Sequence, residues 1–223
     1  TASSTRRVPS RTPATGRSKK VPLTHRNICV STRDICRTLA LGPADRCLCM
    51  WEQFHVGGLV DLLLVPLASG GTVICAGGFD AARFYELLEA KQPTWFQGVP
   101  TTLNELSVYA KKSLTRLGVA PLRFIRPVAA GPLITTNLLP PAPRKPGSVG
   151  PSCGPEIRIE APDGTPLPSG EIGEVAVRGE NVVAGYEDAP EANAHSFRGG
   201  WFHTGDTGYL DADGYLFLKG RLK

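Results

Sequence analysis

The first half of the chain alternates between longer segments with apolar residues at helical spacing and short, mostly apolar runs. The longer segments lie at about 24–41, 56–67, 80–91 and 100–113, and the short runs lie at 46–51, 72–75, 94–97 and 123–127. Segments of the first kind predict helices, with Asp80 as the N-cap of one, and runs of the second kind predict buried strands. Regular alternation of strand and helix predicts βα units, and therefore a largely parallel sheet covered by helices.

The pattern changes after Gly131. Residues 134–155 are rich in proline and glycine with little periodicity, which is typical of a connector. Farther on, EIRIEAPDGTPLPSGEIGEVAVRG and DTGYLDADGYLFLKG each place alternating apolar residues on both sides of an Asp-Gly pair, a strong hairpin signal. We therefore expect an α/β fold with a parallel sheet layered with helices, followed by a smaller antiparallel β-rich subdomain.

These changes in pattern predict five segments along the chain. They are an irregular basic leader at 1–20, an α/β subdomain at 21–133, a connector at 134–155, a β-rich subdomain at 156–218 and a short C-terminal segment at 219–223.

Composition fits a globular chain with one sizeable core, since 41% of the 223 residues are hydrophobic. The formal net charge of +5 comes from the N-terminal end of the given sequence, where residues 1–26, the leader and the six residues after it, hold seven basic and no acidic side chains. A solvated tail explains this charge better than a nucleic-acid site, so a nucleic-acid binder remains a distant alternative. No apolar run is long enough to span a bilayer. The six cysteines form no CxxC pair, which favours a reducing intracellular compartment and gives no metal site.

The most distinctive chemistry lies in GWFHTGDTGYL, where Gly205 directly precedes Asp206. A glycine lets the backbone turn tightly, and the carboxylate after it can accept hydrogen bonds from two neighbouring hydroxyls, such as a ribose diol. For the isolated motif, an aspartate that only caps the turn before the hairpin is the better explanation. Arg221 stands on the return strand of the hairpin, which can bring it near Asp206 and so favours the functional interpretation.

Two further stretches are weaker candidates. The segment TPATGRSKKV, with Thr15, Gly16 and Lys19, can cradle phosphate groups, but Pro13 lacks the N–H donor that such a loop uses. His55 in FHVGG can line an acyl or thiol channel, although a lone histidine at a helix start is more often structural. His203 has the same ambiguity. No Ser-His-Asp or HExxH pattern points to hydrolysis.

The order of these motifs identifies a resemblance. PLTHRNI, FHVGG, PTWFQGVPTT, RKPGSVG, GEVAVRG, GWFHTGD and GRLK occur in the same order as in the adenylate-forming superfamily of acyl-CoA synthetases, 4-coumarate–CoA ligases and luciferases. The chain resembles this superfamily over residues 12–223, and most of all its oxalate–CoA ligase-like branch. The resemblance implies an AMP-forming acid–CoA ligase, in which a carboxylate and Mg-ATP give an acyl-adenylate and coenzyme A then displaces AMP. It also implies a cytoplasmic or peroxisomal location.

The resemblance assigns roles to particular residues. Asp206 and Arg221 correspond to residues that hold the ribose hydroxyls, and Lys223 corresponds to a hinge lysine that contacts the adenylate. His55 corresponds to a residue beside the acyl and coenzyme A channel. The remnant of the phosphate loop consists of Thr15, Gly16 and Lys19.

The chain also departs from the family pattern. Pro13-Ala14 replaces the central Gly-Thr of the phosphate loop, and Leu133 runs directly into a segment that resembles the stretch on the C-terminal side of the YGxTE motif. We therefore expect a partial chain that lacks YGxTE and the C-terminal domain with its catalytic lysine. Two interpretations stay open: part of an acid–CoA ligase, or a non-catalytic remnant that binds a nucleotide, coenzyme A or a partner protein.

Overall fold

The structure, a computed structural model, describes residues 8–12, 19–113, 122–127 and 134–222. The chain divides into two compact units. The first unit comprises residues 1–34 and 133–223, and the second unit comprises residues 35–132. No helix among the described residues is long and apolar enough to cross a membrane.

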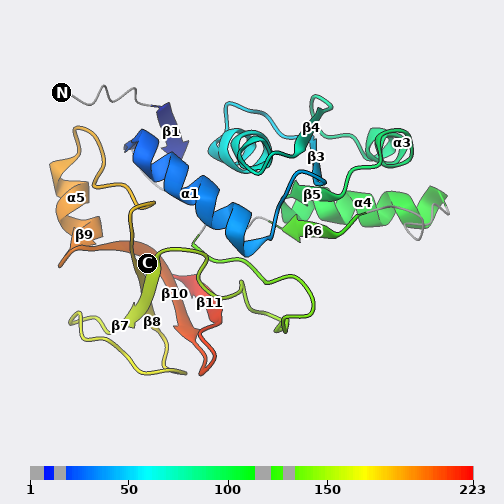
Figure 1. The fold of residues 1–223 in the computed structure, drawn as a ribbon. Helices are drawn as coiled ribbons and strands as arrows, with labels where there is room; N and C mark the ends of the chain where they lie inside the picture. The colour runs from blue at the N-terminus through cyan, green and yellow to red at the C-terminus, as the bar shows by residue number, and fades with distance from the viewer. Residues whose placement is uncertain (1–7, 13–18, 114–121, 128–133, 223) are drawn as a thin grey trace. The chain divides into compact units, whose positions relative to one another are not determined.

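The second unit contains a parallel sheet with the strand order β4-β3-β5-β6 (Figure 1). The strands are β3 (Arg46–Cys49), β4 (Thr72–Cys75), β5 (Trp95–Gly98) and β6 (Phe124–Pro127). Between them the chain forms η1 (Gly57–Leu64), α2 (Val65–Ala68), α3 (Ala81–Lys91) and α4 (Pro100–Ser113). Parallel neighbours need such crossover connections, and the predicted parallel sheet with its helices is confirmed.

Local chemistry fixes the ends of α3. The side chain of Asp80 accepts a hydrogen bond from the backbone N–H of Arg83 at 2.7 Å, which confirms the predicted N-cap. At the other end Gln92 adopts a left-handed conformation with φ of 49°, and its N–H donates to the carbonyl of Leu88.

The helix predicted over 56–67 is present but is not regular, because its first part, η1, is a π-helix. Gly58 lies so close to the preceding loop that a Cβ there would stand 2.2 Å from the carbonyl oxygen of Glu52. This approach is a tertiary constraint that apolar periodicity does not reveal. π-helical turns are rare and often lie near functional sites.

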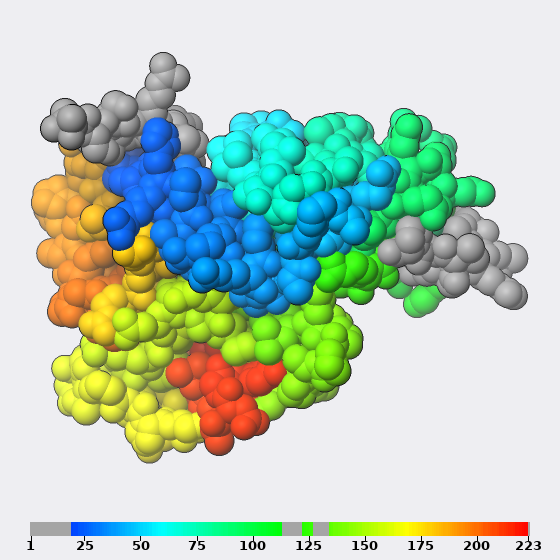
Figure 2. Space-filling view, in the orientation of Figure 1, coloured from blue at the N-terminus to red at the C-terminus, as the bar shows by residue number. Residues whose placement is uncertain are grey.

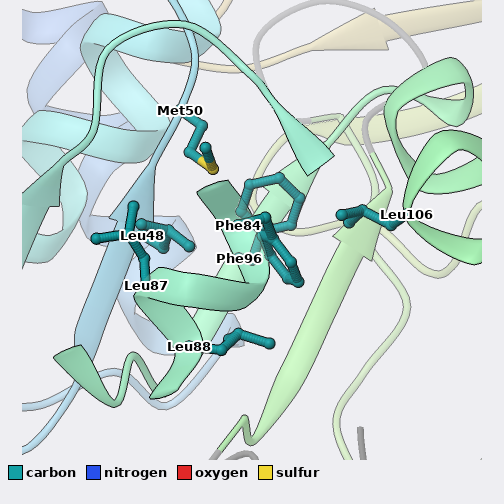
Figure 3. Close-up of a cluster of buried hydrophobic side chains, with 7 residues drawn as sticks. All are labelled: Leu48, Met50, Phe84, Leu87, Leu88, Phe96 and Leu106. Carbon is teal, nitrogen blue, oxygen red and sulfur yellow. The ribbon is translucent and has the colours of Figure 1, made fainter. Parts of the chain in front are cut away.

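The core of the second unit forms where α3 packs on the sheet and α4. Figure 3 shows the rings of Phe84 and Phe96 meeting edge to face, with centroids 4.9 Å apart. Each buried side chain of this size contributes about 1.5–3 kcal/mol relative to exposure. The rest of the cluster consists of Leu48, Met50, Leu87, Leu88 and Leu106.

The first unit is built on an antiparallel sheet with the order β11-β10-β8-β7, and β9 also pairs with β10. Its strands are β7 (Glu156–Glu160), β8 (Gly173–Arg178), β9 (Phe197–Arg198), β10 (Trp201–Leu210) and β11 (Leu216–Arg221). The unit also holds the hairpin of β1 (Val8–Thr12) and β2 (Lys19–Leu23), the short helix α5 (Pro190–Ser196), and the start of α1 (His25–Thr38). The predicted antiparallel part is therefore confirmed.

The two Asp-Gly turns behave differently. In the β10–β11 turn, Asp211 accepts hydrogen bonds from the backbone N–H groups of Asp213 and Tyr215, as expected for a tight hairpin. After the turn at Asp163 the returning segment pairs with β7 only near Pro166, and β8 begins at Gly173. The predicted Asp-Gly turn is therefore present, and β7 and β8 pair antiparallel as expected, but a longer connection separates them. Pro166 has no N–H to donate and cannot continue the ladder directly after the turn.

The segment before β7 packs against the C-terminal hairpin. The N–H of Val149 donates to the carbonyl of Leu216 at 2.9 Å, and Leu216 belongs to the core cluster with Ile159, Val175 and Val177. In Figure 2 this hairpin, in red, lies at the surface of the unit against green atoms of the same segment. The hairpin that carries Asp206 and Arg221 is thus anchored on a packed sheet.

Candidate nucleotide site

Asp206 and Arg221 form an ion pair across the β10–β11 hairpin. They are register partners, and Nε of Arg221 lies 2.9 Å from Oδ1 of Asp206. The side chains are 27% and 64% exposed, so both reach solvent. The predicted approach of these two residues is confirmed, while their role as ligands of a ribose stays a prediction.

The backbone turn before Asp206 is held from several sides. Gly205 has φ of 75°, which favours glycine, and its N–H donates to Oε1 of Glu174 at 3.2 Å. Its carbonyl accepts from the N–H of Leu222 at 2.8 Å. The N–H of Asp206 donates to the hydroxyl of Thr204 at 3.1 Å.

The pairing of β10 is irregular on both sides of Asp206. Its register with β8 shifts between His203 and Thr207, and its register with β11 shifts between Thr207 and Gly208. Such bulges re-aim side chains and are common beside active sites. The Asp206 carboxylate is therefore presented by a fixed, kinked strand.

A cluster of polar side chains around the buried His203 supports this kinked strand. His203 is 6% exposed, and its Nδ1 lies 3.2 Å from Oε2 of Glu174 and 3.7 Å from Oε2 of Glu160. Arg198 lies 3.1 Å from the same Glu174 oxygen and pairs with the histidine ring nitrogen at 2.9 Å. One carboxylate, that of Glu174, therefore connects the buried histidine to the turn at Gly205.

Sequence reasoning left His203 ambiguous and did not single out Glu174. The sequence did contain one signal for Glu174, because it is an acidic residue inside the otherwise largely apolar strand segment GEVAVRG. Its partner at Gly205 lies on another strand, so local pattern could not identify it.

Elsewhere in the first unit, the side chain of Lys19 lies over the aromatic ring of Tyr186. Nζ of Lys19 lies 4.8 Å from the ring centroid of Tyr186. Burial raises the pKa of Tyr186, while a hydrogen bond with Ser196 and the positive charge of Arg221 oppose that shift. The pKa of Tyr186 therefore responds to the charge of Arg221, and its ring is in contact with the Lys19 ammonium group.

The strand that carries Lys19 is fixed by backbone pairing. The N–H of Glu187 donates to the carbonyl of Lys20 at 3.0 Å, which ties β2 to the segment that contains Tyr186. Thr12 and Lys19 are register partners of the β1–β2 hairpin and frame the predicted phosphate loop. Thr15 and Gly16 of that loop, like Lys223, lie outside the described residues.

His55 belongs to the second unit. Its ring stacks on Trp51 with centroids 4.6 Å apart, and Nδ1 accepts a hydrogen bond from the N–H of Gly57 at 3.1 Å. In the neutral ring the proton is then on Nε2, in an exposed side chain. The arrangement leaves one ring N–H available to a ligand.

The described residues contain no group of three His, Cys, Asp or Glu side chains that could hold a metal ion.

Comparison with known proteins defines the class of protein to which the chain belongs. The family of AMP-binding enzymes matches residues 14–126, just over half of the chain. The chain is 34% identical to the sulfoacetate–CoA ligase of Cupriavidus necator, over 94% of this chain and 46% of the relative. It is 36% identical to the oxalate–CoA ligase of Saccharomyces cerevisiae, over 94% of this chain and 43% of the relative.

Solved structures give the same class. Apo MatB from Rhodopseudomonas palustris matches with a TM-score of 0.81 at 30% identity, over 95% of this chain and 47% of that chain. The O-succinylbenzoate coenzyme A synthetase of Bacillus subtilis, in complex with AMP, matches with a TM-score of 0.83 at 28% identity, over 95% of this chain and 48% of that one.

This chain belongs to the family of AMP-binding enzymes, within the adenylate-forming superfamily. The family resemblance inferred from the ordered motifs is confirmed. The chain spans about half the length of the curated relatives named above.

Proposed function

We propose that this chain forms the nucleotide-binding part of an AMP-forming acid–CoA ligase. The observation that carries the proposal is the Asp206–Arg221 ion pair beside a turn that Glu174 and Leu222 hold by hydrogen bonds to Gly205. The same unit also holds Lys19 over the ring of Tyr186. A ribonucleotide has hydroxyl groups that a carboxylate can bind and phosphates that cations attract. The first unit offers both kinds of group.

In this proposal Asp206 accepts hydrogen bonds from the two ribose hydroxyls. Arg221 orients the carboxylate, and its guanidinium has further N–H donors for the ligand. Lys19, with Thr15 and Gly16, lies toward the phosphates, where a positive charge stabilises the developing negative charge. Lys223 contacts the adenylate at the hinge.

The proposed reaction has two group-transfer steps, and neither requires an oxidant or a reductant. The substrate carboxylate attacks the α-phosphate of ATP, and pyrophosphate leaves. The coenzyme A thiol, after losing its proton, then attacks the acyl carbonyl and AMP leaves. We place His55 beside the acyl and coenzyme A channel, where its exposed N–H can donate to a ligand.

The carboxylic acid substrate is proposed by class only. The names of the relatives include sulfoacetate, oxalate and 4-coumarate, which share a carboxylate and little else. Mg²⁺ would accompany ATP in this reaction. A cytoplasmic or peroxisomal location remains part of the proposal.

A second candidate is a non-catalytic protein that binds a nucleotide, coenzyme A or a partner protein. It is favoured by Pro13-Ala14 in the phosphate loop, since this pair removes a backbone donor and a hydroxyl from the place where the triphosphate binds in relatives.

The experiment that separates the two is pyrophosphate release. The 223-residue chain is incubated with ATP, Mg²⁺ and a panel of carboxylic acids, and AMP binding is measured in parallel. Pyrophosphate that appears only with particular acids supports the ligase. A flat trace from a chain that binds AMP contradicts catalysis by these 223 residues alone and keeps their role in nucleotide binding. A folded chain that does neither contradicts both.

A further inference from the structure

Two parallel strands of the second unit end side by side, each with a cysteine. Cys49 is the last residue of β3, Cys75 is the last residue of β4, and the two are register partners. Register partners on adjacent strands point to the same face of a sheet. Neighbouring strands lie about 4.8 Å apart, which is within the Cα separation of about 4.4–6.8 Å that disulfides require.

The two thiols have different environments. Cys75 is exposed, whereas Cys49 is buried with 3% of its surface exposed. Burial raises the pKa of the Cys49 thiol, a hydrogen bond to the backbone of Trp51 opposes this shift, and the nearby Cys75 raises it further. The amide of Gln53 lies 3.9 Å from the Cys75 sulfur, where it can stabilise a thiolate.

We propose that Cys49 and Cys75 form a dithiol site that a low-molecular-weight disulfide of the glutathione type converts to an internal disulfide. Cys75 is the entry thiol because it is accessible and has an amide donor beside it. Cys49 is the resolving thiol because it stands opposite Cys75 in register. Both are free thiols in this structure.

The exchange balances in two steps. The Cys75 thiolate attacks one sulfur of the external disulfide, forms a mixed disulfide and expels one external thiolate. Cys49 then loses its proton to water, attacks the Cys75 sulfur and expels the second external thiolate. Two protein thiols are oxidised, and one external disulfide is reduced to two thiols.

Cys47 is a natural comparison within the same strand. It lies on the same face of β3 but its register partner on β4 is Val73, so it does not stand opposite Cys75. Burial raises the pKa of the Cys47 thiol well above its usual value, and the nearby Cys49 and Cys75 add to the shift. Cys47 is thus near the site and is a poor resolving thiol.

The disulfide has a structural consequence. It ties β4, an edge strand of the described sheet, to β3 at their carboxyl ends, directly before the segment that holds Trp51 and His55. A covalent link between distant residues restricts the unfolded chain. Oxidation is therefore expected to raise the melting temperature of the second unit.

The test is thiol mapping of the 223-residue chain. Reduced protein is incubated with oxidised glutathione under native conditions, remaining thiols are blocked with N-ethylmaleimide, and the chain is cleaved by endoproteinase Glu-C. This protease cuts after Glu52 and so separates Cys49 from Cys75. We expect a cross-linked peptide pair that contains both residues, lighter than the sum of its parts by two hydrogens, about 2 Da.

Three variants sharpen the assignment. Cys49→Ser should trap Cys75 as a mixed disulfide with glutathione, whereas Cys47→Ser should leave the internal link intact. Cys29→Ser is the control for an exposed cysteine outside the parallel sheet, and it should also leave the link intact. The proposal is overturned by wild-type protein in which Cys75 stays glutathionylated or alkylated, or in which the six cysteines pair without preference.

Discussion

The carboxylate of Glu174 accepts a hydrogen bond from the backbone N–H of Gly205 at 3.2 Å, although the two residues lie on different strands. Its second oxygen lies 3.2 Å from Nδ1 of His203, a side chain that is almost fully buried. The turn that presents Asp206 is therefore held from inside the sheet. This is the support that a ligand-binding carboxylate needs to keep one geometry.

Replacement of Glu174 by alanine should weaken AMP binding about tenfold. The Gly205 N–H then loses a charged acceptor, and hydrogen bonds to charged groups contribute about 1.5–3 kcal/mol. Glu174→Gln keeps an oxygen acceptor and should retain most of the affinity. Titration calorimetry with AMP measures both variants.

The matched control for this prediction is Glu171→Ala, an exposed residue three positions earlier whose described hydrogen bond joins its backbone N–H to the carbonyl of Pro168. Its AMP affinity should equal that of the wild type. If Glu171→Ala and Glu174→Ala bind AMP equally well, Glu174 does not position the site.

Lys19→Met should weaken binding of ATP about tenfold while it leaves the affinity for adenosine nearly unchanged. The side chain lies over Tyr186, and in the proposed binding mode its charge faces the phosphates and not the ribose or the base. Lys20→Met is the control, because Lys20 is exposed and its described bond to Glu187 uses only its backbone. An equal loss for ATP and adenosine would argue for a purely structural lysine.

In the second unit, Arg126→Ala should reduce the free energy of unfolding by about 3–5 kcal/mol, as expected when one partner of a buried pair is removed. Nη1 of Arg126 lies 3.3 Å from Oδ2 of Asp61, which also accepts from Gln97 at 2.9 Å. Burial raises the pKa of Asp61, and Arg126 opposes the shift.

The double variant Asp61→Leu, Arg126→Met should recover much of that loss, because it removes both charges together. Urea denaturation measures the single and double variants. If the two replacements destabilise the unit additively, the pair is not coupled as the structure indicates.

Stability of the second unit should fall in acid partly through Asp45. Burial acts to raise the pKa of Asp45, but hydrogen bonds from Arg123, the N–H of Gly42 and the hydroxyl of Thr94 outweigh it, and the pKa is lowered. A carboxyl with a lowered folded pKa stabilises the fold above its unfolded pKa of about 3.9. This stabilisation is lost as the pH falls through the folded pKa.

The check is the pH dependence of urea unfolding for wild type and Asp45→Asn. The variant should be less stable near neutral pH, and the gap should close as the pH falls below about 4. Asp61 titrates in both proteins, so the difference isolates Asp45. A gap that stays constant down to strongly acidic pH would contradict the assignment.

The sequence predicted the elements whose causes are local. The N-cap at Asp80 and the β10–β11 hairpin depend on neighbouring residues, and the hairpin alone places Asp206 opposite Arg221. The order of motifs added the family, which composition and spacing could not supply.

The remaining parts of the site depend on contacts between distant segments. The approach of Lys19 to Tyr186 requires β2 to pair beside Glu187, and the bond from Gly205 to Glu174 requires the register of β8 and β10. At the start of the π-helix, Gly58 likewise lies close to the backbone of Glu52. Local periodicity carries no signal for any of these.

The measurement that tests the account most directly compares AMP with 2′,3′-dideoxy-AMP as ligands of the 223-residue chain. If Asp206 holds the ribose diol, wild-type protein should prefer AMP about tenfold or more, since the charged hydrogen bonds contribute about 1.5–3 kcal/mol. Asp206→Ala should bind AMP about tenfold more weakly and lose the preference. Asp163→Ala, in an exposed turn of the same unit, should keep both affinity and preference. Equal binding of the two ligands by the wild type, or a preference that survives in Asp206→Ala, would contradict the assignment of this hairpin as the ribose site.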